Sequence, residues 1–143
     1  MNTSSGMKTS LLEQFQKELS DPVALVMRAA EGLAVNVFDT LVQLTELNEN
    51  QLAAFINVTP GTIRYYRVRP SKVGRAGSEQ ILLLLALYER GHTLFGSSGA
   101  FNGWLRQPVP GLGGIIPFDL LYTPGGIHLV TEELIRIECG ALA

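Results

Sequence analysis

The stretch LNENQLAAFINVTPGTIRYYRVR, residues 47–69, carries two helix-start signals separated by one turn. Asn48 is a favourable N-cap, and Gln51 stands three residues later, which is the spacing of a capping box. Asn57 tolerates the left-handed conformation that ends a helix. Thr59-Pro60 then begins a second helix with an N-cap and the residue best tolerated at the first helical position. We therefore expect two short helices joined by a tight turn.

The two expected helices differ in character. The first has an apolar face, formed by Leu52, Ala53, Phe55 and Ile56. The second has only Ile63 and Tyr66 to turn inward, and its other side chains are mostly polar or basic. Such a pair is typical of a helix-turn-helix, which lays its second helix in the major groove of DNA. Two short helices that serve structure alone would show the same pattern.

Charge around this stretch favours contact with phosphate. Between Val58 and Ser78 there are basic residues and no Asp or Glu, whereas the whole chain has a net charge of −2. One basic patch on a mildly acidic body suits a protein that touches nucleic acid on one face, and a merely solvated face is the alternative. The residues predicted to contact DNA are Thr59, Thr62, Arg64, Tyr65, Arg67, Arg69, Lys72 and Arg75.

Length and composition bound the architecture. At 143 residues the chain is one domain or two small domains that share a core. Hydrophobic residues make up 46% and charged residues 17%, which suggests more apolar surface than one monomer buries. We therefore expect a homodimer or another protein partner. The longest apolar run, residues 81–88, is far short of the roughly 18 residues of a membrane span.

Residues that could support catalysis or bind metal are sparse. Cys139 is the only cysteine, which excludes an internal disulfide and suits a reducing cytoplasm; it is expected to pack in an apolar helix. His92 and His128 lack a second ligand at the spacing of a metal site. Asp119 has no neighbouring carboxylate for acid–base chemistry and is expected to orient its own turn. We predict no catalysis, no metal and no cofactor.

Hydrophobic periodicity predicts helices for most of the remaining chain. Residues 1–20 are expected to be a partly disordered tail. A helix over residues 21–32 would turn Val23, Val26, Met27 and Ala30 inward, and one over residues 36–47 would bury Val37, Leu41, Leu44 and Leu47.

After a loop at residues 70–77, an apolar helix begins at residue 78, and Gly91 is expected to interrupt it. A short helix over residues 100–106 and an irregular segment over residues 107–117 follow. The last helix starts at Thr123-Pro124, would turn Ile127, Val130, Leu134 and Ile137 inward, and would stop at Gly140. No stretch alternates at period two, so we predict an all-α protein.

The C-terminal third, LFGSSGAFNGWLRQPVPGLGGIIPFDLLYTPGGIHLVTEELIRIECGALA, resembles the C-terminal domain of the Xre–MbcA–ParS antitoxins. The resemblance rests on an ordered series of residues: Phe95-Gly96, Ala100, Trp104-Leu105, Pro108, Leu112-Gly113-Gly114, Pro117, Leu120-Leu121, Thr123, Gly126, Val130, Leu134, Ile137 and Gly140. The upstream part is similar to the Xre-type helix-turn-helix of the same family. The chain departs from the family at Val109, where members often carry a polar residue.

The resemblance implies an antitoxin of a type II toxin–antitoxin pair without catalytic activity of its own. It implies a helix-turn-helix and dimerisation domain over residues 21–95 and a toxin-binding domain over residues 96–143. The implied partners are a RES-domain toxin, which consumes NAD, the chain's own promoter DNA and a second copy of the chain. The implied toxin-binding residues are Trp104, Leu112, Asp119, Glu138, Gly140, Ala141, Leu142 and Ala143.

Two other functions remain open at this point. The chain could be an ordinary helix-turn-helix transcription regulator whose C-terminal half only dimerises or senses a small molecule. It could also be an enzyme, although no residues stand at catalytic spacing. A neighbouring RES-type gene whose product co-purifies with this chain would favour the antitoxin.

Overall fold

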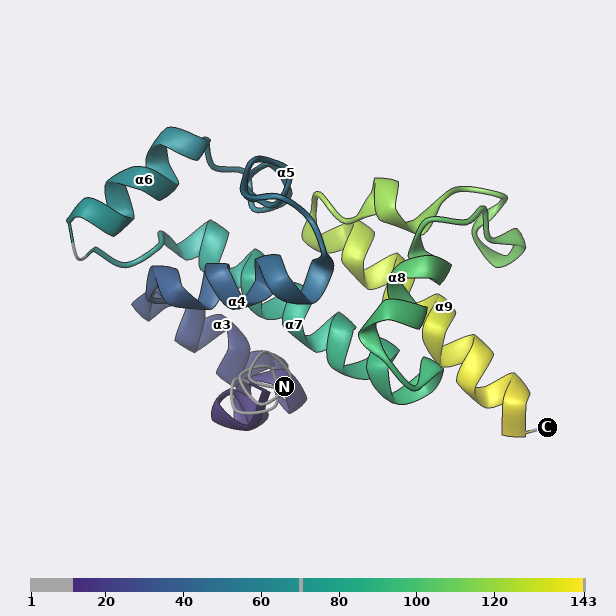
Figure 1. The fold of residues 1–143 in the computed structure, drawn as a ribbon. Helices are drawn as coiled ribbons and strands as arrows, with labels where there is room; N and C mark the ends of the chain where they lie inside the picture. The colour runs from purple at the N-terminus through teal and green to yellow at the C-terminus, as the bar shows by residue number, and fades with distance from the viewer. Residues whose placement is uncertain (1–11, 70, 143) are drawn as a thin grey trace, which may run out of the picture. The chain divides into compact units, whose positions relative to one another are not determined.

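The structure is a computed structural model that describes residues 12–69 and 71–142 (Figure 1). The described residues form helices and short connections, which confirms the prediction of an all-α protein. The chain divides into two compact units between Ala86 and Leu87, and each is described by itself below. Of the N-terminal tail expected over residues 1–20, residues 1–11 lie outside the described part, whereas Gln16–Ser20 form helix α2. The predicted domain boundary at residues 95 and 96 stays a prediction.

The first unit contains α2 (Gln16–Ser20), α3 (Pro22–Glu31), α4 (Val35–Thr45), α5 (Glu49–Phe55), α6 (Pro60–Val68) and the first part of α7 (Arg75–Phe95). The apolar stripe predicted around α4 is confirmed, since its four members are all buried. The apolar face of α5 is confirmed in the same way. Helix α6 contacts both α4 and α5, and it buries only Ile63 completely.

The start signals of α5 and α6 act as the sequence indicates. Asn48 Oδ1 accepts a hydrogen bond from Gln51 N at 2.8 Å, and Gln51 Oε1 accepts one from Asn48 N at 3.0 Å, which completes the capping box. Asn57 adopts φ 62° in the turn. Thr59 caps α6, with its Oγ1 accepting from Thr62 N at 3.1 Å. The two-helix unit therefore forms from local signals.

The prediction for α3 is wrong about which face is buried. Leu25 and Ala29 are buried, whereas the four residues expected inside face solvent: Val23, Val26, Met27 and Ala30. All six residues repeat at helical spacing, so periodicity supports either face. Arg28, one turn after Leu25, lies over the ring of Phe15, which is 2% exposed, so the Leu25 side of α3 is the side turned toward Phe15.

The second unit contains the end of α7, α8 (Ser98–Leu105), two 3₁₀ turns, η1 (Pro110–Leu112) and η2 (Pro117–Leu120), and α9 (Pro124–Leu142). Gly91 does not interrupt α7, which continues to Phe95. A Cβ at Gly91 would lie 2.3 Å from the ring of Phe101, so the glycine is a packing contact. Gly140 does not end α9, which continues to Leu142. Both predictions treated a glycine inside a helix as a break.

Candidate functional site

The candidate DNA-facing surface consists of α6 and the loop that follows it. Of its predicted residues, Thr62 is half-buried and the other seven are exposed. The hydroxyls of Thr59 and Thr62 lie 2.9 Å apart and bond one another at the start of the helix. The guanidinium of Arg69 lies over the ring of Tyr65, 5.9 Å from its centroid, which fixes two of the predicted contact residues against each other.

The loop after α6 is anchored to the link between α3 and α4. Val73 N donates to Leu33 O at 2.8 Å. The buried hydroxyl of Ser78 accepts from Leu33 N and donates to Val73 O, each at 3.0 Å. A Cβ at Gly32 would lie 2.9 Å from the Cβ of Lys72, so the chain approaches too closely there for any side chain. These contacts hold exposed Lys72 in a defined place near α6.

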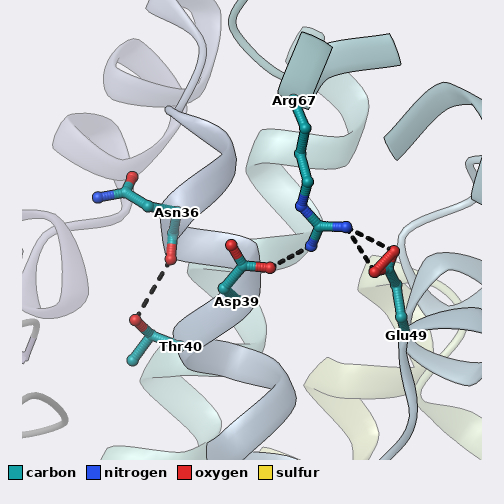
Figure 2. A network of polar contacts seen from close by, with 5 residues as sticks. All are labelled: Asn36, Asp39, Thr40, Glu49 and Arg67. Atoms are coloured by element: carbon teal, nitrogen blue, oxygen red, sulfur yellow. Dashed lines mark hydrogen bonds and ion pairs between the residues drawn. The ribbon is translucent and has the colours of Figure 1, made fainter. Parts of the chain in front are cut away.

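Arg67 is engaged differently from the other predicted contact residues (Figure 2). Its Nη1 donates to both carboxylate oxygens of Glu49, at 2.7 and 2.6 Å, and its Nη2 donates to Asp39 Oδ1. The pKa of Arg67 is raised, chiefly because it donates to Glu49 and also because Asp39 lies beside it. The side chain is 35% exposed. Arg67 therefore links α6 to α4 and α5.

Sequence reasoning missed three residues of this surface. Asp39 and Glu49 lie 28 and 18 positions before Arg67, and no local spacing connects them to it. Val68 is 82% exposed and Tyr65 is 53% exposed, so α6 presents apolar atoms outward. In the sequence, the position of Val68 between two arginines was the available signal that its aliphatic side chain is exposed.

In the second unit, Trp104 belongs to a cluster of aromatic rings. It is half-buried, and its ring lies 5.6 Å from that of Phe95 and 6.0 Å from that of Phe101. Tyr88 meets Phe101 edge to face at 5.1 Å, and its hydroxyl bonds to Asn102 Oδ1. Trp104 therefore leaves part of its ring open on a rigid base.

The irregular segment after α8 closes on itself. Val109 N donates to Ile115 O at 3.1 Å, and Gly114 N donates to Val109 O at 2.9 Å. Val109 is 5% exposed, which accounts for its apolar character at this position. The guanidinium of Arg106 lies 4.5 Å from the centroid of the Phe118 ring, and this contact ties the end of α8 to η2.

A buried carboxylate that sequence reasoning missed supports this segment. Glu133 on α9 is 7% exposed, and a Cβ at Gly111 would lie 2.3 Å from its Oε2. Arg136 pairs with Glu133 Oε1 through Nε at 2.9 Å and Nη2 at 2.7 Å. The segment beside Leu112 therefore rests on the carboxylate of a residue in the middle of α9.

The other predicted toxin-binding residues lie in η2 and along α9. Asp119 is exposed in η2, near the first turn of the helix, where a Cβ at Gly126 would lie 1.7 Å from Leu120 O. Glu138 pairs with Arg90 at 3.3 Å, and Gly140 is exposed near the other end. The backbone of Ala141 and Leu142 continues α9, and Ala143 lies outside the described residues. Among the described residues, Asp119 and Glu138 thus belong to different elements, η2 and α9.

The remaining candidates are the single cysteine, a histidine, and possible metal sites and membrane spans. Cys139 is exposed, so the expectation that it packs in an apolar helix is wrong. His128 lies 3.2 Å from Glu132, one turn along α9. Within the described residues, no group of three or more His, Cys, Asp or Glu side chains could hold a metal ion. In that same part of the chain, no helix is both long and apolar enough to cross a membrane.

Comparison with known proteins finds a family model that matches most of the second unit. Residues 90–140 match the family model described as the antitoxin Xre/MbcA/ParS C-terminal toxin-binding domain, which confirms the resemblance expected from the sequence. The chain is also similar to a protein of Sphingobium sp. (strain YBL2) named Prs ADP-ribosylating antitoxin. The two are 26% identical over 133 residues, covering 87% of this chain and 84% of that relative.

Proposed function

We propose that this chain, whose residues 90–140 match the model of the antitoxin Xre/MbcA/ParS C-terminal toxin-binding domain, neutralises a RES-type toxin that consumes NAD. The family match is the observation that carries the proposal. The name of the Sphingobium relative pairs an antitoxin with ADP-ribosylation, a chemistry that uses NAD, and so supports a toxin of that substrate class. In this proposal the chain itself has no catalytic role and acts in the cytoplasm.

The end of α9 is the proposed inhibitory element. Cys139 and Gly140 are exposed, and the backbone of the helix continues to Leu142, so the exposed positions lie near the end of α9. A helix end presents backbone carbonyl groups that lack partners within the helix. Inserted at the entrance of the toxin's active site, it would act by occlusion and by these acceptors. Trp104, Leu112 and Asp119 would supply further contacts.

The toxin-binding proposal is tested by co-expression with the RES-type toxin of the adjacent gene. The full chain should co-purify with the toxin, restore growth and suppress NAD consumption in a purified assay. Deletion of residues 140–143 should abolish suppression of NAD consumption. Replacement of the same residues by Gly-Ser-Gly-Ser keeps the length of the chain, so it tests whether the residues themselves are required. A toxin that is neither bound nor inhibited by the full chain would overturn the proposal and favour a transcription regulator without a toxin partner.

A second part of the proposal is repression of the chain's own operon through α6. The exposed basic residues and the acid-free stretch from Val58 to Ser78 support contact with DNA phosphates, and outward Tyr65 supports contact with base edges. Titration of the chain's own upstream DNA at several salt concentrations tests it. The affinity should fall as salt rises, and no binding at 50 mM salt, the low end of the range in which such affinity is usually lost, would exclude repression.

The proposed homodimer has a candidate surface on α3. Val23, Val26 and Met27 are 71%, 51% and 63% exposed, and with Ala30 they form a stripe at helical spacing. Charges of both signs border it, from Lys17, Glu18, Asp21, Arg28 and Glu31. A two-fold pairing of this helix with its copy sets each sign against the other, which is what a self-complementary interface needs.

A further inference from the structure

We infer that Arg67 is a positioning residue that fixes the pose of α6, and that it does not contact the phosphates of DNA. This inference rests on the proposed DNA-binding function of α6 and changes the role of one of its predicted contact residues. The geometry in Figure 2 carries it, since two carboxylates from two other helices converge on one guanidinium.

The place of Arg67 on the helix is the first argument. It stands four residues after Ile63, so the two side chains lie roughly 40° apart around the helix axis. Ile63 is the only residue of α6 that is completely buried. Tyr65 and Val68 lie on the far side, roughly 200° and 140° from Ile63, and are exposed. Arg67 therefore belongs to the face that docks on α4 and α5.

Charge is the second argument. Arg67 with Asp39 and Glu49 forms a group whose formal charge is −1, so the group as a whole does not attract a phosphate. To reach DNA, Arg67 would have to leave three hydrogen bonds made by both of its terminal nitrogens. Within the described residues, the structure pairs neither Arg64 nor Arg69 with a carboxylate. Those two cations are available to phosphate.

The supports of the two carboxylates are the third argument. Glu49 is the first residue of α5, directly after Asn48, and the capping box of Asn48 and Gln51 holds that end of the helix. Asp39 follows Phe38 on α4, and Phe38 is completely buried. Both acceptors thus stand on fixed backbone. A helix with a single buried anchor gains its second fixed point from them.

The discriminating measurement is the slope of log affinity against log salt for the chain's own upstream DNA. Each phosphate contact contributes about −0.9 to this slope. Arg67→Gln, which keeps much of the stem of the side chain, should weaken binding roughly fivefold or more and leave the slope as in the unaltered chain. Arg64→Ala is the matched control and should flatten the slope by about 1.

Arg67→Lys separates charge from geometry. A lysine keeps the positive charge but lacks the planar fork that bridges two carboxylates. The inference expects Arg67→Lys to weaken binding nearly as much as Arg67→Gln. A phosphate contact would instead be largely preserved by lysine. Circular dichroism of each variant confirms that the helices are retained.

Each outcome decides between the alternatives. A slope that flattens in Arg67→Gln as it does in Arg64→Ala overturns the inference and leaves the DNA-binding proposal standing. So does unchanged affinity in both Arg67 variants. If the unaltered chain binds no DNA, the repressor proposal fails. The positioning role of Arg67 is then tested by a double-mutant cycle of Arg67→Gln and Glu49→Gln in urea unfolding. Additive effects of the two substitutions on the free energy of unfolding would refute that role.

Discussion

Gly91 and Phe101 meet with no space for a side chain between them. A Cβ at Gly91 would lie 2.3 to 2.5 Å from three carbon atoms of the Phe101 ring. That ring is completely buried and also contacts the rings of Tyr88, Phe95 and Trp104. The ring cannot retreat without disturbing its other neighbours, so the closeness of α7 and α8 depends on the missing side chain.

We expect Gly91→Ala to destabilise the protein by about 1–3 kcal/mol, as overpacking of a core does. Gly103→Ala on α8 is the matched control, because a Cβ there meets nothing within 4 Å. The control should be stabilising by about 0.5–1 kcal/mol, since alanine is the better helix former. Urea unfolding measures both changes, and equal effects at the two glycines would contradict the packing argument.

Two threonine hydroxyls should contribute differently to the stability of the protein. Thr59→Ala removes the side-chain acceptor of Thr62 N, which also donates to Thr59 O, and should cost about 1 kcal/mol of unfolding free energy. Thr40→Ala also removes one threonine hydroxyl hydrogen bond, to Asn36 O within α4, but leaves no backbone N–H without its partner. It should be within about 0.5 kcal/mol of the unaltered chain. Thermal unfolding of the pair distinguishes the two cases.

Substitutions of Glu138 and of its partner Arg90 should distinguish an effect on stability from an effect on toxin binding. Their side chains are 44% and 41% exposed, so breaking the pair should cost at most about 1 kcal/mol. If Glu138 contacts the toxin, Glu138→Gln weakens toxin binding, whereas Arg90→Gln frees the carboxylate and does not weaken it. Titration calorimetry of each variant against the toxin measures this. Equal losses in both variants would make the pair structural.

The stabilisation from Arg67 should not change with pH in the ordinary range. Its pKa is raised in the folded protein, so the stabilisation is complete below the unfolded-state pKa and is lost only as pH rises through the higher folded value. We expect Arg67→Gln to cost about 0.5–1 kcal/mol, equally at about pH 6 and about pH 10. If the cost of Arg67→Gln decreases between these two pH values, another titrating group is involved.

The apolar stripe on α3 should control self-association. Met27→Asp places a charge in the middle of the proposed two-fold interface and should convert a dimer into a monomer in sedimentation velocity. Gln43→Asp is a suitable control, since Gln43 is exposed on α4 outside the stripe. A dimer that survives Met27→Asp with unchanged affinity would place the interface elsewhere.

Local signals account for what could be predicted of the fold. Asn48, Gln51, Thr59 and Pro60 act through neighbours three residues away or fewer, and each does what its chemistry implies. Glycines inside helices are harder to interpret from the sequence. Gly91 and Gly140 disfavour a helix locally, but the helices α7 and α9 continue through them. In α7, the contact with Phe101 that requires the glycine is invisible in the local sequence.

The candidate site was predictable only for residues whose role is local. The exposed cations after Thr59 follow from composition and helix spacing. The carboxylates that bind Arg67, and Glu133 beneath Gly111, depend on which helices meet in three dimensions. Two residues that touch across 18 or 28 positions leave no periodic trace, so the sequence does not distinguish Arg67 from the cations that have no carboxylate partner in the described residues.

Helix α7 has a practical consequence for dissecting the molecule. The division between the two units falls at Ala86 and Leu87, in the interior of this one helix, with Leu85 and Tyr88 buried close to the division. Proteases cut exposed loops and not buried helical backbone, so limited digestion should not release the second unit by cleavage at the join. A fragment that begins at Leu87 starts within a helix and lacks its first three turns. Work on an isolated second unit therefore needs a start at or before Arg75.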